Sequence, residues 1–165
     1  MRVSVLTAAA ILVSASPSWA GEWKAVGAAG GHGEQLALAI DDTHSYIFEC
    51  APDAVVITET GVTELIDLKA KAKVGDAPGS VMPEGAAVMA LFTGKGDPEF
   101  QAASYAANPA GGWDLTIRTA KGDKRLNGLA KTDMFSLFTT GFTAAVTLSA
   151  AEKKMFADFL SRCRA

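Results

Sequence analysis

The sequence predicts a mainly β domain: a small antiparallel β-sandwich or barrel with a C-terminal α-helix packed on it. Roughly six to eight short apolar or alternating segments are separated by Gly, Pro and Asp turns, a pattern typical of small all-β domains. The C-terminal segment instead repeats its apolar residues at helical spacing. One cysteine lies in each kind of segment, Cys50 in a strand-like run and Cys163 in the helix-like one, so a bond between them would join helix to sheet.

The first strands are expected to form a hairpin. QLALAI and HSYIFEC flank Asp41–Thr43, whose residue types favour a tight turn. In the second segment Tyr46, Phe48 and Cys50 occupy alternate positions, so they should share one face of the strand.

The later strands are bounded by turn residues in the same way. They are AVVITET, which follows Pro52-Asp53 and stops at Gly61, AAVMALF between Gly85 and Gly94, WDLTIRT, and MFSLFTT. In WDLTIRT the alternation places Trp113 on the buried face and Arg118 on the opposite one. TELIDLKAKAK and FTAAVTL fit a strand or a short helix. AKGDKR is expected to be a solvated hairpin tip, and AKVGDAPGSVMPEG and AANPAGG to be mobile loops.

The C-terminal helix has both a start signal and a buried stripe. Ser149 and Glu152 form the S-x-x-E pattern of a capping box. The apolar positions fall at i, i+3, i+4 and i+7: Phe156, Phe159, Leu160 and Cys163. Cys163 is therefore expected on the face that packs against the sheet.

Residues 1–20 have the form of a cleaved secretory signal peptide. Arg2 precedes an apolar run, and the small-x-small pattern Ser18-Trp19-Ala20 ends the segment. A membrane anchor is the alternative, but the run is well short of the ~20 apolar residues that cross a bilayer. Residues 21–165 are then one β-rich domain, periplasmic or secreted, with no stable membrane insertion after cleavage.

The export signal predicts a disulfide between Cys50 and Cys163, the only cysteines of the chain. Closing a loop on the order of 100 residues would contribute roughly 4–5 kcal/mol in the chain-entropy model. A redox-active thiol pair or a pair of metal ligands is the alternative. Redox motifs usually place their cysteines two residues apart, and a metal site needs further ligands, so a structural bond is favoured.

Composition excludes some classes of function. The full chain has a formal net charge of −3, and removing Arg2 with the leader takes the mature chain near −4. There is no basic stripe with interleaved aromatics, so a nucleic-acid partner is not expected. Trp23 and Trp113 could line a binding surface, but aromatic residues in strands more often belong to the core.

The sequence predicts no catalytic, cofactor-binding or metal-binding residue. G-x-S-x-G and S-x-x-K are absent, and the glycines around Lys95 lack the spacing of a phosphate-binding loop. His32 and His44 would lie at opposite ends of the expected hairpin, so they should not share a metal. The many carboxylates leave an acid–base pair open, since sequence alone does not show which two converge.

One stretch resembles a known family. In FSLFTTGFTAA, Phe135, Leu137 and Gly141–Ala145 resemble the closing segment of the invasion-associated locus B family of exported bacterial proteins, and the preceding WDLTIRTAKGDKRL is similar in kind. The chain departs from the family's pattern by two spare residues before Gly141, by the long capped helix that follows, and by lacking an internal cysteine pair of that family's kind. The resemblance implies an exported β-rich domain without a known catalytic centre, associated with host or envelope interaction.

Three classes of function remain. The favoured one is an exported, non-enzymatic domain that binds a protein or an envelope component. The alternatives are a periplasmic small-molecule carrier and an enzyme with a carboxylate site. An apolar surface patch would favour the first, an internal cavity the second, and convergent acidic residues with shifted pKa values the third.

Overall fold

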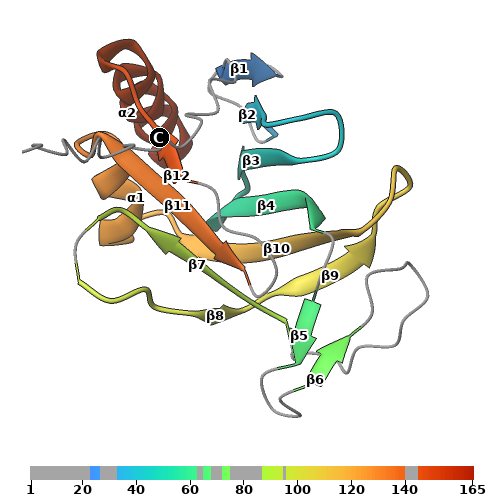
Figure 1. Ribbon diagram of the computed structural model, residues 1–165. Coiled ribbons are helices and arrows are strands. Elements are labelled where there is room, and N and C mark those ends of the chain that lie inside the picture. The colour runs from blue at the N-terminus through green and yellow to red at the C-terminus, as the bar shows by residue number, and fades with distance from the viewer. Residues whose placement is uncertain are drawn as a thin grey trace, which may run out of the picture.

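The computed structural model describes residues 23–26, 33–62, 65–67, 72–74, 87–94, 96–139 and 145–165, the two short strands at 65–67 and 72–74 as backbone alone (Figure 1). The elements within these residues are β1 (Trp23–Val26), β2 (Gln35–Ala39), β3 (Ser45–Cys50), β4 (Ala54–Val62), β5 (Leu65–Asp67), β6 (Ala72–Val74), β7 (Val88–Phe92), β8 (Gln101–Ala102), β9 (Ser104–Ala107), β10 (Trp113–Ala120), α1 (Lys124–Leu129), β11 (Met134–Thr139), β12 (Ala145–Thr147) and α2 (Ala150–Arg164).

The strands form two open antiparallel sheets in a sandwich-like arrangement. One sheet has six strands in the order β1-β2-β3-β4-β10-β9, and the other has four in the order β12-β11-β7-β8. The strands β5 and β6 form a separate two-stranded sheet. The mainly β fold with a C-terminal helix is confirmed. Because both main sheets are open, the architecture is sandwich-like and not a closed barrel (Figure 1).

Most strand predictions are confirmed. β2 and β3 pair as the expected hairpin, with Leu36 opposite Phe48 and Leu38 opposite Tyr46. TELIDLKAKAK contains the strand β5 and the first two residues of β6, and FTAAVTL contains β12. β4 does not stop at Gly61, which continues the strand with φ of +72°. A side chain there would place its Cβ 2.3 Å from the carbonyl oxygen of Thr43, so the strand can run past the β2–β3 turn only with glycine.

The prediction of a hairpin tip at AKGDKR is wrong. β10 ends at Ala120, and the chain turns into α1 instead of returning as a strand. The Asp123 side chain caps this helix by accepting from the Arg125 amide, and Leu126 and Leu129 are fully buried on its inner face. The cap at Asp123 and the apolar pair Leu126 and Leu129 together favour a helix, although the segment is rich in cationic residues.

The two expected mobile loops have different outcomes. The AANPAGG segment is a tight turn between β9 and β10, in which the Asn108 amide donates to the Gly112 carbonyl and the Gly111 amide to the Asn108 carbonyl. In AKVGDAPGSVMPEG, residues 72–74 form β6, and the rest lies outside the described residues.

The core is an aromatic cluster to which both sheets and α2 contribute. Phe156 of α2 packs with ring centroids 4.8 Å from Trp23, 5.2 Å from Phe48 and 6.1 Å from Phe135. Trp23 and Phe48 come from the six-stranded sheet, and Phe135 comes from the four-stranded sheet. The helix therefore fills space between the sheets, and its stripe of Phe156, Phe159, Leu160 and Cys163 is buried as the spacing predicted.

Candidate functional site

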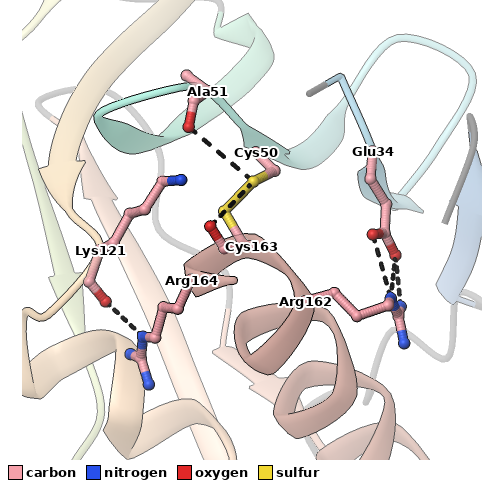
Figure 2. The surroundings of a disulfide bond; sticks show 7 residues. All are labelled: Glu34, Cys50, Ala51, Lys121, Arg162, Cys163 and Arg164. Carbon is pink, nitrogen blue, oxygen red and sulfur yellow. Dashed lines mark hydrogen bonds and ion pairs between the residues drawn. A yellow bond between two sulfur atoms is a disulfide. The ribbon is translucent and has the colours of Figure 1, made fainter. Parts of the chain in front are cut away.

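The predicted disulfide is present. Cys50, the last residue of β3, is bonded to Cys163 in the last turn of α2, and their Cα atoms are 5.5 Å apart (Figure 2). Both cysteines are buried, with 4% of their surface exposed. The bond therefore lies at the contact between helix and sheet, where the alternation in β3 and the stripe in α2 had placed it.

Polar contacts surround this bond (Figure 2). Arg162 donates through Nε and Nη2 to the carboxylate of Glu34, which is only 2% exposed. The hydrogen bond to Glu34 raises the pKa of Arg162, so this guanidinium stays charged. Arg164 donates from Nε to the Lys121 carbonyl at 2.7 Å. These contacts tie the end of α2 to the start of β2 and to the β10–α1 turn.

The pairing of Glu34 with Arg162 was not predicted. The two residues are 128 positions apart, and neither lies in a motif. Only the docking of α2 brings them together, so the sequence holds no local signal for it. The disulfide, the Glu34–Arg162 ion pair and the hydrogen bond from Arg164 to Lys121 together hold the C-terminal end of α2 to the rest of the fold. We call these residues the tail anchor: Glu34, Cys50, Lys121, Arg162, Cys163 and Arg164.

A second unusual group is the carboxylic acid of Glu59, which lies inside the sandwich. Inward-facing residues on β4 are Val55, Ile57 and Glu59, and the side chain of Glu59 has 0% of its surface exposed. Its neighbours across the sheet are Tyr46 on β3 and Leu115 on β10. Among the described residues, neither of its carboxyl oxygens has a hydrogen-bond partner.

Burial controls the charge of Glu59. Because a carboxylate loses its hydration there, the pKa rises from an ordinary value of 4.5 to about 8. The group is therefore mainly a neutral acid at pH 7. The sequence did contain a signal for it, since the alternation of AVVITET puts Glu59 on the same face as Val55 and Ile57.

The geometry around Glu59 differs from that of an acid–base pair. Glu34 is the other buried carboxylate of the described chain, and it belongs to the tail anchor, where it pairs with Arg162. A general acid must also reach its substrate, and a side chain with no exposed surface does not do so in this conformation.

The histidines give no metal site within the described residues. His44 lies at the β2–β3 turn, with Nδ1 2.9 Å from Oδ2 of Asp41, whereas His32 falls outside the described residues. Partial burial acts to raise the pKa of Asp41, but hydrogen bonds from the amides of Thr43 and His44 outweigh it and hold this pKa well below its ordinary value. No group of three or more His, Cys, Asp or Glu residues that could hold a metal ion occurs in the part of the chain that is described.

The outer side of the six-stranded sheet carries a regular row of exposed and half-buried side chains. One row of aligned residues crosses every strand of the sheet: Lys24, Ala37, Ile47, Thr58, Thr116 and Ser104. Its members are all exposed or half-buried, and Thr58 and Thr116 are joined by a hydrogen bond of 3.0 Å between their hydroxyls. We call this row and its flanking residues Gln35, Glu49, Val56, Thr60 and Asp114 the outer face.

Two hollows flank α1. The larger has a volume of about 340 Å³, and its described lining is Thr93, Gly94, Gly128, Lys131, Thr132 and Asp133. The smaller, of about 160 Å³, lies at the other end of the helix, beside Lys124 and Arg125. Small-molecule sites are usually lined by apolar and aromatic side chains, and the short polar lining of the larger hollow differs from that pattern.

Within the described residues, no helix has both the length and the apolar character needed to cross a membrane. Comparison of the chain with protein-family models, with curated proteins and with solved structures found no match.

Proposed function

We propose that the mature chain is an exported, non-enzymatic domain that binds a protein or an envelope component through its outer face. The observation that carries this proposal is the row from Lys24 to Ser104, whose members are exposed or half-buried on all strands of the six-stranded sheet. The helix α2 lies on the other, inner side of the sheet, where Phe156 packs against Phe48 and Phe135.

The chemistry of the outer face suits a protein partner. Its central side chains are short or β-branched, with Ile47 and Val56 beside Thr58, Thr60 and Thr116. Short side chains lose little rotamer entropy on binding, and a sheet held by antiparallel ladders has little backbone left to order. The surface thus offers apolar area and hydroxyl hydrogen bonds on a rigid support.

Export is supported by two features of the chain. Residues 1–20 have the pattern of a cleaved leader, and the cysteine pair is oxidised, as is usual in the periplasm or outside the cell. The resemblance of Phe135–Ala145 to the invasion-associated locus B family supports the same role, and its residues 140–144 lie outside the described residues. Mass spectrometry of the exported protein should find Gly21 at its N-terminus, and an intact Met1 on cytoplasmic protein would contradict export.

The binding role can be tested with one variant and one control. Mature protein with a C-terminal tag is used to capture partners from an envelope extract, and mass spectrometry identifies what is retained. Thr58→Arg places a long charged side chain at the centre of the outer face, whereas Ala157→Arg does so on the exposed side of α2. We expect Thr58→Arg to reduce capture at least tenfold and Ala157→Arg to leave it unchanged. Equal capture by both variants, with both folded, would refute binding by this face.

A further inference from the structure

We propose that Glu59 acts as a protonation-controlled latch at the end of the sandwich opposite the disulfide: the neutral acid keeps this end closed, and its ionisation opens it while the tail anchor stays shut. The proposal concerns the fold itself and does not depend on the identity of a binding partner.

Glu59 lies at the end of the β3–β4 pair that is far from the disulfide. Three inward pairs follow one another along β3 and β4: Cys50 with Val55, Phe48 with Ile57, and Tyr46 with Glu59. The first pair lies at the disulfide, and the third is the farthest from it. Any opening that hydrates Glu59 can therefore begin at the end of β4 that carries no covalent tie to the helix.

Glu59 lies in an interior that is mainly apolar. Apolar side chains dominate the described interior: Leu115 and Ile117 on β10, Leu38 on β2, Met89 and Leu91 on β7, and Phe135 and Leu137 on β11. Tyr46 is the titratable side chain paired with Glu59 on β3, and the buried residues of the described chain include no Lys or Arg. A carboxylate formed here has no described counter-charge, and it reaches hydration only if the interior opens.

The carboxylates at the rim of this end have hydrogen-bond partners of their own. Asp114 accepts from Asn108 Nδ2 at 2.6 Å and from the Gly61 amide at 3.3 Å. Asp41 accepts from the amides of Thr43 and His44, and its carboxylate also contacts the His44 ring. Both groups lie in the turns or on the outer face and not in the interior, so they are separate from the titration of Glu59.

The closure at this end consists of contacts that can separate. Besides the contact of Gly61 with Thr43, a Cβ on Gly112 would lie 2.7 Å from the Val62 carbonyl oxygen, so the β9–β10 turn also fits closely against the end of β4. The Ser45 amide donates to Thr60 Oγ1 at 2.9 Å. An opening at this end breaks hydrogen bonds and van der Waals contacts, and no covalent bond.

The test is hydrogen exchange of the oxidised mature protein between pH 6 and 9.5, corrected for the intrinsic pH dependence of amide exchange. Between the ordinary pKa of 4.5 and the folded pKa of about 8, each pH unit should raise the open population about tenfold, because opening is then coupled to the loss of one proton, and the rise should level off above about pH 8. We expect this rise in the peptides that contain Tyr46, Glu59–Val62 and Trp113. The peptides around Cys50 and Cys163 should keep their protection.

Three variants make the test specific. Glu59→Gln keeps the shape and removes the charge, so it should abolish the rise, and Glu59→Met provides a second neutral side chain if the glutamine variant does not fold. Glu49→Gln alters a glutamate on the outer side of β3, which accepts from Gln35, and should leave the rise intact. An unchanged rise in both neutral Glu59 variants would overturn the latch. So would flat exchange up to pH 9.5 in the wild type, or an equal loss of protection at the tail anchor.

Discussion

The two ends of the β3–β4 pair are held together in opposite ways. At the Cys50 end, a disulfide, a part-buried ion pair and the last turn of α2 meet within a few residues. At the Glu59 end, the described closure consists of packing, glycine-dependent turns and hydrogen bonds around an uncharged acid. Of the two ends, the Glu59 end holds the buried acid whose pKa is raised into the neutral range.

This difference follows from where each charge has a partner. Glu34 is buried beside a guanidinium, so its negative charge is compensated in the folded protein. Glu59 is buried without one, so the folded state favours the neutral form. Two glutamates with similar exposure thus have opposite electrostatic roles.

The largest expected effect is common to both ends, because both depend on aromatic packing. Phe159→Ala at the anchored end and Trp113→Ala at the Glu59 end should each lower the free energy of unfolding by about 3–5 kcal/mol, since both side chains are buried and truncation leaves a cavity. Chemical denaturation of the oxidised proteins measures this. A cost below about 1 kcal/mol at either position would show that the end concerned is not packed as described.

Removing the disulfide should weaken the end of the β3–β4 pair that it holds to α2. The double variant Cys50→Ala, Cys163→Ala should lose about 2–5 kcal/mol, in line with the removal of a disulfide that closes a long loop. Hydrogen exchange should then show faster opening of α2. Protection of α2 equal to that of the wild type would mean that packing and the Glu34–Arg162 pair hold the helix without the bond.

The pH dependence of stability has a definite sign. The folded pKa of Glu59, about 8, lies above its ordinary value of 4.5, so the folded protein binds more protons between these values. Its contribution should therefore make the protein more stable as pH falls from about 8 to about 4.5, and should be constant below that range. Glu59→Gln should remove this contribution and be more stable than the wild type at pH 9 by about 1–3 kcal/mol, less than the full ionisation term because a buried amide also needs partners.

Thermal unfolding of the two proteins at several pH values measures this effect. A wild-type stability that does not rise on going from pH 9 to pH 6, or that rises equally in Glu59→Gln, would show that the ionisation of Glu59 is not the source.

Patterns within one segment were sufficient to predict several features. The capping box at Ser149, the helical stripe through Cys163 and the strand alternation of Tyr46 and Cys50 are local, and each appears in the structure as expected. The disulfide followed from them because the chain has only these two cysteines.

Features that depend on distant partners were missed. The pairing of β4 with β10, which places Glu59 beside Leu115, joins strands far apart in the chain and has no local signal. The Glu34–Arg162 pair has the same origin. α1 is a different case, because its signals at Asp123, Leu126 and Leu129 are local, but the run is short and its charged residues suggested an exposed turn.

The smallest expected effect tests the orientation of β10, on which the position of Glu59 beside Leu115 depends. Arg118 lies on the outer side of this strand, and its ion pair with Asp53 is solvent-exposed, with 57% and 74% of the two side chains accessible. Exposed pairs of this kind contribute about 0–1 kcal/mol, because water and salt screen the charges and two long side chains must be ordered. Arg118→Ala should therefore change the free energy of unfolding by less than about 1 kcal/mol, and the difference should shrink further in high salt. Trp113→Ala on the opposite side of the same strand is the matched comparison in the same denaturation experiment. Equal losses at the two positions would mean that the inner and outer sides of β10 are interchanged, and the assignment of Glu59 to the interior would then be wrong as well.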